Sequence, residues 1–177
     1  NGFQIITGDA ARAAAEYAAK TAYKETDAAT YQAMEALVHN LNTMNSRAGA
    51  QVPFSSLNYG TDTSPEGRMA VHNLLRATEA GLGDGETPIF PVQIFKVKEG
   101  VNYNEGDPNY DLFRHALRCS AKRLFPNFSF LDAPFNLQYY KPGDYNTEVA
   151  YMGCRTRVMG NVFDNTKEVT CGRGNLS

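Results

Sequence analysis

Cysteine is scarce in this sequence, and its spacing argues against both a disulfide framework and a metal site. The chain has 3 cysteines in 177 residues, and no two of them form a Cys-x-x-Cys pair. An odd number at uneven spacing argues against a disulfide framework and favours a reducing compartment. Without paired cysteines, or a His/Glu spacing that suits a metal ion, we expect no metal site. The cysteine pattern favours a cytoplasmic protein.

Long apolar runs, strong charge and nucleotide fingerprints are also missing. No run approaches the ~20 apolar residues of a membrane span, and the first residues do not follow a signal-peptide pattern, so we expect no membrane contact. The formal net charge of −2 gives no reason to expect nonspecific binding to nucleic acid. No P-loop is present, and the glycines of 81–85 lack the spacing and the preceding strand of a dinucleotide-binding loop. What remains is an ordinary globular composition, with 42% hydrophobic and 20% charged residues.

The first part of the chain predicts two helices. Residues 9–23 are rich in alanine, the best helix former, and Asp9 suits the N-cap position. Apolar residues recur at helical spacing over 28–45. Because the connection at 24–27 is short, we expect an antiparallel helical hairpin over residues 1–46. Both helices are expected in the core of one domain, and a subunit interface is the alternative.

Strands and helices alternate over the rest of the chain. Ser64 and Pro65 suit the first turn of a helix that Gly81 would end, and a further helix is expected over 109–124. Extended segments are expected at 51–59, 89–97, 128–131 and 149–152. This alternation predicts an α/β fold with mostly parallel strands. The sequence contains no internal repeat and no low-complexity segment.

A lone cysteine beside glycine and arginine is the main candidate for chemistry. Cys154 lies in the segment MGCRTR (152–157), and its neighbour Gly153 permits a tight turn from which the sulfur could project. Arg155 and Arg157 could bind a phosphate, pair with carboxylates or shape the loop. About twenty residues later, the segment GRGN (172–175) ends in Asn175, whose amide could orient a diol without taking a proton. The alternatives are a buried structural thiol and a turn asparagine.

Together with SRAGAQVPF (46–54) and TPIFP (87–91), these two segments resemble the large subunit of anaerobic, class III (glycyl-radical) ribonucleoside triphosphate reductases. The resemblance covers nearly the whole chain and is densest over 37–177. It implies an α/β fold in which 47–177 form part of a ten-stranded catalytic barrel, behind the helical hairpin and within a single partial domain. The family's large subunit is several times longer, and we find neither its glycyl-radical loop nor its cysteine-rich zinc segment here. We expect an internal fragment that is inactive in isolation.

The resemblance also implies an activity, namely reduction of ribonucleoside triphosphates to deoxyribonucleotides for DNA replication. Cys154 would carry a thiyl radical that removes the 3′-hydrogen of the ribose, and Asn175 would hold the ribose hydroxyls. The glycyl radical would lie outside this chain, supplied by an activase that uses S-adenosylmethionine and an iron–sulfur cluster, with no cofactor bound within the chain. Nucleotide effectors such as ATP, and a second copy in a homodimer, are further implied partners.

Hydroxyl groups ahead of the helix at 64–81 are candidate substrate ligands. Ser55 and Ser56, and the cluster at 61–64, precede a helix N-terminus, where phosphate or ribose contacts are favoured. Ordinary turn and cap roles are the alternative. Cys119 is expected in the core, and Cys171 receives no role. The three histidines are expected at surface or capping positions, and they are His39, His72 and His115.

Two other functions stay open at this point. Another glycyl-radical enzyme, such as an acyl-cleaving lyase, would share the barrel and the loop cysteine, but those lyases typically carry adjacent cysteines. A truncated, non-catalytic module that associates through its helical hairpin is the second alternative.

Overall fold

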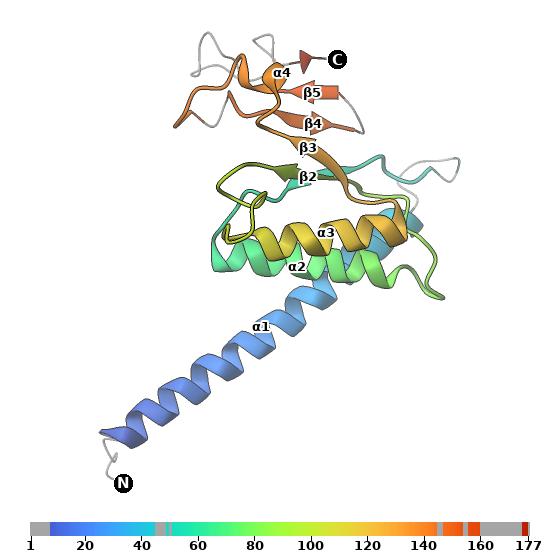
Figure 1. The fold of residues 1–177 in the computed structure, drawn as a ribbon. Coiled ribbons are helices and arrows are strands. Elements are labelled where there is room, and N and C mark those ends of the chain that lie inside the picture. The colour runs from blue at the N-terminus through green and yellow to red at the C-terminus, as the bar shows by residue number, and fades with distance from the viewer. Residues whose placement is uncertain are drawn as a thin grey trace.

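The computed structural model describes residues 8–44, 49, 51–144, 147–153, 156–159 and 175–176. Figure 1 shows the helices α2 and α3 on one side of a parallel sheet and a small antiparallel sheet on the other side. The elements are α1 (Asp9–Thr43), β1 (Ser56–Tyr59), α2 (Pro65–Ala80), β2 (Val92–Val97), α3 (Tyr110–Arg123), β3 (Asn127–Phe130), α4 (Pro134–Leu137), β4 (Ala150–Met152), β5 (Thr156–Val158) and β6 (Asn175–Leu176).

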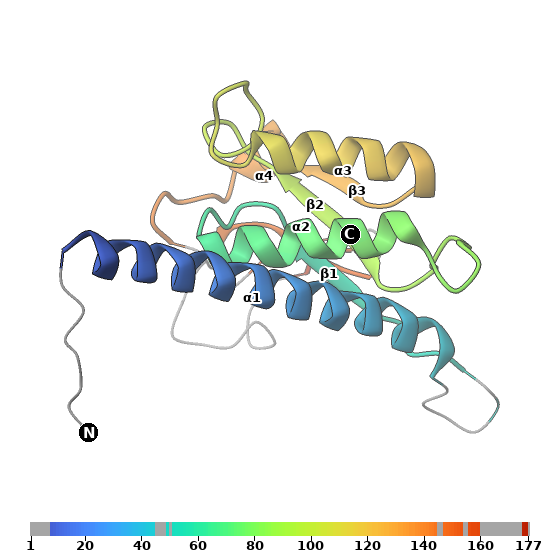
Figure 2. The same ribbon diagram turned by 90° about the horizontal axis from the view of Figure 1, so that it is seen from below.

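The N-terminal part is one continuous helix, so the helical hairpin predicted within residues 1–46 is wrong. α1 runs over 35 residues without a break, as Figures 1 and 2 show. The expected connection at 24–27 holds neither glycine nor proline, so no residue there stops the helix. The hydroxyl of Thr30 donates to the backbone oxygen of Thr26 at 2.7 Å, as it can in an unbroken helix. The division of the chain at residue 46 stays a prediction.

Only the second half of α1 is packed into the protein. Val38 is 1% exposed and lies in a cluster with Leu74 and Ala77 of α2. Earlier in the helix, Tyr17 is 74% exposed and Tyr23 is 63% exposed. The expectation that the whole segment lies in a core therefore fails for its first half, where alanine-rich sequence offers little apolar surface to bury.

The three parallel strands have the order β1-β2-β3. Ser56 is paired with Val92, and Ile94 is paired with Asn127, so the parallel pairing expected from the alternation is confirmed for this sheet. α2 and α3 supply the main core against one of its faces, and Cys119 lies there fully buried, as expected. Burial raises the pKa of the Cys119 thiol to about 11, which suits an unreactive structural residue.

The second sheet is antiparallel, with the order β4-β5-β6, and the expectation of parallel pairing does not hold there. Met152 is paired with Thr156, so only residues 153–155 connect β4 to β5. A connection this short can join antiparallel strands but not parallel ones. The described strands thus form an α/β arrangement of two three-stranded sheets.

The ends of α2 follow the sequence. The Ser64 side chain accepts a hydrogen bond from the Gly67 amide at 3.1 Å, and Pro65 is the first helical residue. Gly81, with φ of 88°, ends the helix. No helix in the described part of the chain has the length and hydropathy needed to cross a bilayer.

Candidate functional site

The candidate site lies on the sheet face opposite α2 and α3, which we call the polar face. Side chains alternate between the two faces of a strand. Because Tyr59, Phe95 and Phe128 pack in the core under the helices, the neighbouring positions point the other way. These positions carry the polar residues Ser56, Asn58, Lys96 and Ser129.

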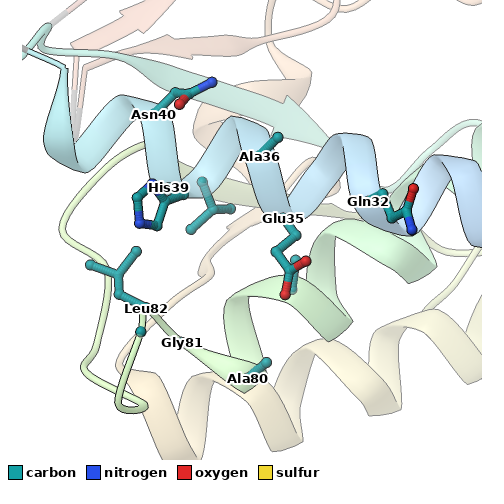
Figure 3. A pocket seen from close by; sticks show the side chains of 11 residues that line it. Gln32, Glu35, Ala36, His39, Asn40, Ala80, Gly81 and Leu82 are labelled. Atoms are coloured by element: carbon teal, nitrogen blue, oxygen red, sulfur yellow. The ribbon is translucent and has the colours of Figure 1, made fainter.

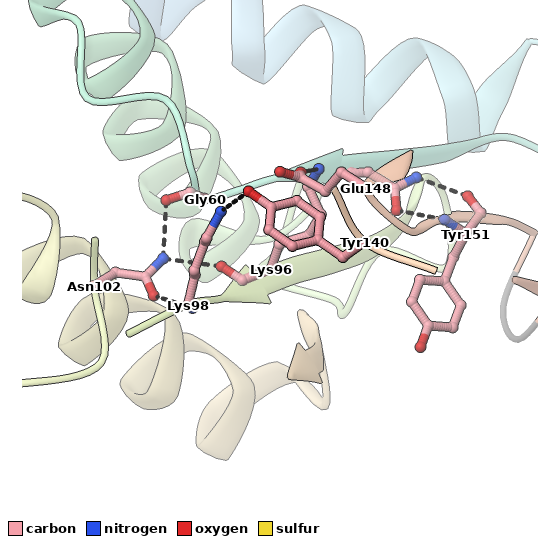
Figure 4. Close-up of polar contacts among 8 residues, drawn as sticks. Gly60, Lys96, Lys98, Asn102, Tyr140, Glu148 and Tyr151 are labelled. Atoms are coloured by element: carbon pink, nitrogen blue, oxygen red, sulfur yellow. Dashed lines mark hydrogen bonds and ion pairs between the residues drawn. The ribbon is translucent and has the colours of Figure 1, made fainter. Parts of the chain in front are cut away.

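β4 is bound to the polar face through side chains of β1, and Figure 4 shows the hydrogen bonds made by the Tyr151 backbone. The Asn58 side-chain amide donates to the carbonyl oxygen of Tyr151 at 2.7 Å and accepts from the Tyr151 N–H at 2.8 Å. The Ser56 hydroxyl accepts from the Gly153 N–H at 3.2 Å. Tyr151 thus lies beside Asn58 and Gly153 beside Ser56, so β4 runs antiparallel to β1 without a backbone ladder between them.

A largely buried ion pair completes this attachment. Lys96 of β2 donates to Glu148, which precedes β4, and their side chains are 14% and 17% exposed. Nearby, Lys98 donates to the Tyr140 hydroxyl at 3.0 Å and lies 4.7 Å from the centre of its ring. The hydrogen bond to Tyr140 raises the pKa of Lys98, against the opposing effect of burial. Lys98 is therefore held in its charged form.

The two candidate substrate-binding serines lie where two of the sequence motifs meet. Ser56 contacts Gly153, as described above, and the buried hydroxyl of Ser55 has no hydrogen-bond partner among the described residues. The Phe54 ring lies 3.3 Å from where a β-carbon on Gly153 would stand, and Gly153 has φ of 65°. The end of SRAGAQVPF is thus packed against the start of MGCRTR, where only glycine fits without strain.

Cys154 lies outside the described residues, as do Arg155 and Cys171. Asn175 is described through its backbone, which pairs with Val158 of β5 in the same small sheet that contains β4. Val158 in turn pairs with Ala150. In this sheet, only β5 separates the strand of Asn175 from β4, the strand that leads into Cys154.

Arg157 shapes the hairpin. Its guanidinium donates to the Asn136 side chain at 3.1 Å and lies 5.0 Å from the centre of the Phe135 ring. Both partners belong to α4. Of the three roles that the sequence allowed for this arginine, the structure shows attachment of β5 to the neighbouring helix.

The hydroxyl cluster at 61–64 lines a cavity at the carboxyl end of β1. The cavity measures about 430 Å³ and is lined by Thr61, Asp62, Thr63, Lys98, Val101 and Glu148. Asp62 accepts a hydrogen bond from the Ser64 amide at 2.8 Å, which lowers the pKa of its carboxyl. Asp62 and Ser64 thus act as turn and cap residues, which was the alternative weighed for this cluster.

Two asparagines that the sequence analysis did not single out hold the loop after β1. The Asn102 amide donates to the backbone oxygens of Gly60 and Lys96, each at 2.9 Å (Figure 4). The Asn109 amide donates to Gly60 at 3.1 Å and to Asp62 at 2.7 Å. Both side chains are fully buried. No sequence signal marks them, because their partners are distant in the chain.

His115 is buried, which corrects its expected place at the surface. Its side chain is 7% exposed, and its Nε2 lies 3.2 Å from Glu79 Oε2. Burial lowers the pKa of His115, while the bond to Glu79 opposes that change. Among the described residues, no group of three or more His, Cys, Asp or Glu side chains could hold a metal ion.

A larger cavity, of about 500 Å³, lies between α1 and the end of α2 (Figure 3). Glu35 and His39 of α1 line one side, and Ala80 and Leu82 line the other. It shares no residue with the polar face, so we do not include it in the candidate site.

Comparisons with known proteins point to one family. The profile described as anaerobic ribonucleoside-triphosphate reductase matches residues 7–177. The chain is 34% identical over 147 residues to the anaerobic ribonucleoside-triphosphate reductase of Escherichia coli K12, an alignment covering 82% of this chain and 20% of that protein. It is 36% identical over 156 residues to the bacteriophage T4 protein of the same name, covering 88% of this chain and 25% of the relative. The chain thus spans a fifth to a quarter of the length of these relatives.

Proposed function

The chain belongs to the anaerobic ribonucleoside-triphosphate reductase family, and on this basis we propose that it forms part of the catalytic barrel of such an enzyme. The substrate would be a ribonucleoside triphosphate and the product a deoxyribonucleoside triphosphate. One observation carries the proposal to the residue level. The segment MGCRTR joins β4 to β5, and Ser56 and Asn58 hold the strand that leads into it against the polar face.

Cys154 would perform the first step on the substrate. A thiyl radical at its sulfur would take the 3′-hydrogen atom of the ribose, which restores the thiol and leaves a radical at C3′. Loss of the 2′-hydroxyl as water, uptake of two electrons and two protons from a formate- or thioredoxin-type reductant, and return of the hydrogen atom from Cys154 to C3′ would give the deoxynucleotide and restore the thiyl radical. A glycyl radical, installed by an activase that uses S-adenosylmethionine and an iron–sulfur cluster, would supply the oxidising equivalent that generates the thiyl radical on Cys154.

Ser55, Ser56 and Asn175 would contact the substrate. The Ser55 hydroxyl is buried and has no partner among the described residues, so it could donate to a substrate oxygen without giving up another bond. Ser56 already accepts from Gly153 but keeps its own proton to donate. Asn175 would hold the ribose hydroxyls with its amide, and its strand lies in the same sheet as β4.

We propose the following features for the complete enzyme. The two sheets would contribute to a ten-stranded α/β barrel, and the complete protein would form a homodimer that responds to nucleotide effectors. The cysteine usage supports a cytoplasmic location. Membership of this family argues against the alternative of an acyl-cleaving glycyl-radical lyase.

Replacement of Cys154 by serine in a complete reductase that carries this sequence tests the proposal. Turnover of the triphosphate should be abolished while binding of the triphosphate is retained, because a serine O–H bond is too strong for a stored glycyl radical to oxidise at a useful rate. Turnover and equilibrium binding are measured on the same preparation. Turnover by the serine variant at even a few hundredths of the parent rate would remove Cys154 as the radical carrier.

A further inference from the structure

We infer that Asn58 is a positioning residue: its amide fixes the register of β4 on the polar face and so the point from which the chain enters MGCRTR. The inference deepens the proposed function and rests on it, because register matters for activity only if Cys154 acts on the substrate. The two contacts involved join residues that are 93 positions apart in the sequence.

The direction of the Tyr151 backbone explains why this amide is needed. Along an antiparallel strand, the N–H and C=O of one residue point to the same side, and those of the next residue point to the opposite side. Both backbone groups of Tyr151 meet Asn58, so they point away from β5. Tyr151 can therefore find no partner in β5, and a half-buried backbone pair without partners is costly.

Asn58 takes the place of a neighbouring strand at this position. Its side-chain amide presents one donor and one acceptor, as a backbone peptide does, and binds both groups of a single residue. A slip of β4 by one residue would bring Met152 or Ala150 into that place with its backbone groups turned toward β5 instead. The amide thus selects one register, and Ser56 repeats the selection two residues further along, at Gly153.

The register has a direct consequence for the segment that follows. Met152 ends β4 and Gly153 begins the connection, so the hold on Tyr151 acts three residues before Cys154. Radical transfer and hydrogen abstraction both need the sulfur at a fixed place, and a misplacement of about 1 Å can lower a rate by about 100-fold. Loss of the amide should therefore lower turnover more than it lowers affinity for the substrate.

Asn42 provides a matched control. Its amide also binds the backbone of a distant segment, with a donated bond to the Phe90 oxygen at 2.6 Å and accepted bonds from Ile89 and Phe90 at 2.8 and 3.0 Å. Those contacts hold the loop ahead of β2, and none involves β4. Asn42→Ala therefore removes at least as many hydrogen bonds as Asn58→Ala, and none of them is made to β4.

The first experiment uses the complete reductase that carries this sequence and needs no activity. Amide hydrogen exchange of Tyr151 should be faster in Asn58→Ala than in the parent, and unchanged in Asn42→Ala. Asn58→Asp should show intermediate exchange, because a carboxylate still accepts from the Tyr151 N–H but cannot donate to its carbonyl. Unchanged Tyr151 exchange in Asn58→Ala would overturn the inference. If Asn58→Ala does not fold, the comparison between Asn58→Asp and the parent decides the question.

The second experiment uses the complete reductase. Asn58→Ala should lower kcat about 10- to 100-fold with KM for the triphosphate changed about twofold or less. The isotope effect with 3′-deuterated substrate should rise, because hydrogen abstraction becomes slower relative to other steps. Asn42→Ala should keep the parent kcat and isotope effect. Equal kcat losses in the two variants, with no change in isotope effect, would overturn the inference.

The Cys154→Ser variant separates this inference from the proposed function. If that variant loses all turnover while Asn58→Ala keeps the kcat of Asn42→Ala, the proposed function stands and the positioning role fails. If the serine variant keeps turnover, the proposed function fails, and a positioning role toward Cys154 fails with it.

Discussion

Lys96 and Glu148 form an ion pair that links the middle strand of the parallel sheet to the segment just ahead of β4. The two residues lie 52 positions apart, and their side chains are 14% and 17% exposed. Removing one partner from such a site leaves a charge that is poorly hydrated and unpaired. Replacing only one member of this pair should therefore destabilise the fold more than replacing both.

Glu148→Gln should lower the free energy of unfolding by about 3 kcal/mol, because the Lys96 ammonium is left without its counter-charge. The double variant Lys96→Met, Glu148→Gln should lose much less, since no charge remains buried. Asp111→Asn is the control, because the Arg68–Asp111 pair has side chains 30% and 64% exposed, and an exposed pair contributes about 0–1 kcal/mol. Denaturant unfolding measures all three. Equal losses of unfolding free energy in the single and double variants would show that an unpaired Lys96 carries no extra cost.

His115 should make folding stability depend on pH. Burial holds its folded-state pKa below the unfolded value, so the unfolded chain binds a proton that the folded chain resists. The stability that the neutral His115 contributes to the folded chain is therefore fully present above the unfolded pKa of about 6.5. It is lost as the pH falls from there through the folded pKa. His115→Gln should flatten the difference in unfolding free energy between pH 8 and pH 5. His39→Gln, at an exposed position, is the control, and an unchanged pH slope in His115→Gln would refute the assignment.

Gly153→Ala should be more damaging than the same change at Gly143. Both glycines have positive φ, 65° and 85°, so alanine is strained at either position by about 1–2 kcal/mol. At Gly153 the added carbon also meets the Phe54 ring at 3.3 Å, whereas at Gly143 nothing lies within 4 Å. The difference in unfolding free energy between the two variants isolates the contact with Phe54. Equal losses would mean that the ring moves aside freely.

Asn175→Ala in the complete reductase should lower kcat far more than it weakens binding of the triphosphate. Most ground-state affinity should come from phosphate contacts, whereas the amide would act on the ribose as it reacts. Steady-state kinetics and equilibrium binding separate the two effects. A loss confined to binding would mean that the amide acts equally in the ground and transition states, and no loss would return Asn175 to a turn role.

Local signals predicted the parts of the fold that depend on neighbouring residues. The cap at Ser64, the stop at Gly81 and a helix close to 109–124 could be read from the sequence, because each depends on residues within a few positions. The helical hairpin was wrong for a related reason. The gap at 24–27 between two helical patterns predicts a short connection, but these four residues contain no helix breaker, so the helix continues through them.

The contacts that organise the candidate site could not be predicted in the same way. Asn58 meets Tyr151, and Lys96 meets Glu148, only after the second sheet is folded onto the first. A single asparagine or lysine in a strand has no pattern that names its partner. The motifs around Ser55 and Gly153 were visible as sequence, but their contact with each other depends on this same folding.

The packing of α1 implies uneven helix stability along its length. At a rise of about 1.5 Å per residue, the helix is about 50 Å long, and its burial is concentrated around Val38. An isolated stretch as short as residues 9–22 is only marginally helical in water, even when rich in alanine. The helical turns around Tyr17 therefore depend on nucleation at the packed end of α1. The helix should extend from its contact with α2 toward its N-terminus, and it should fray first at Asp9.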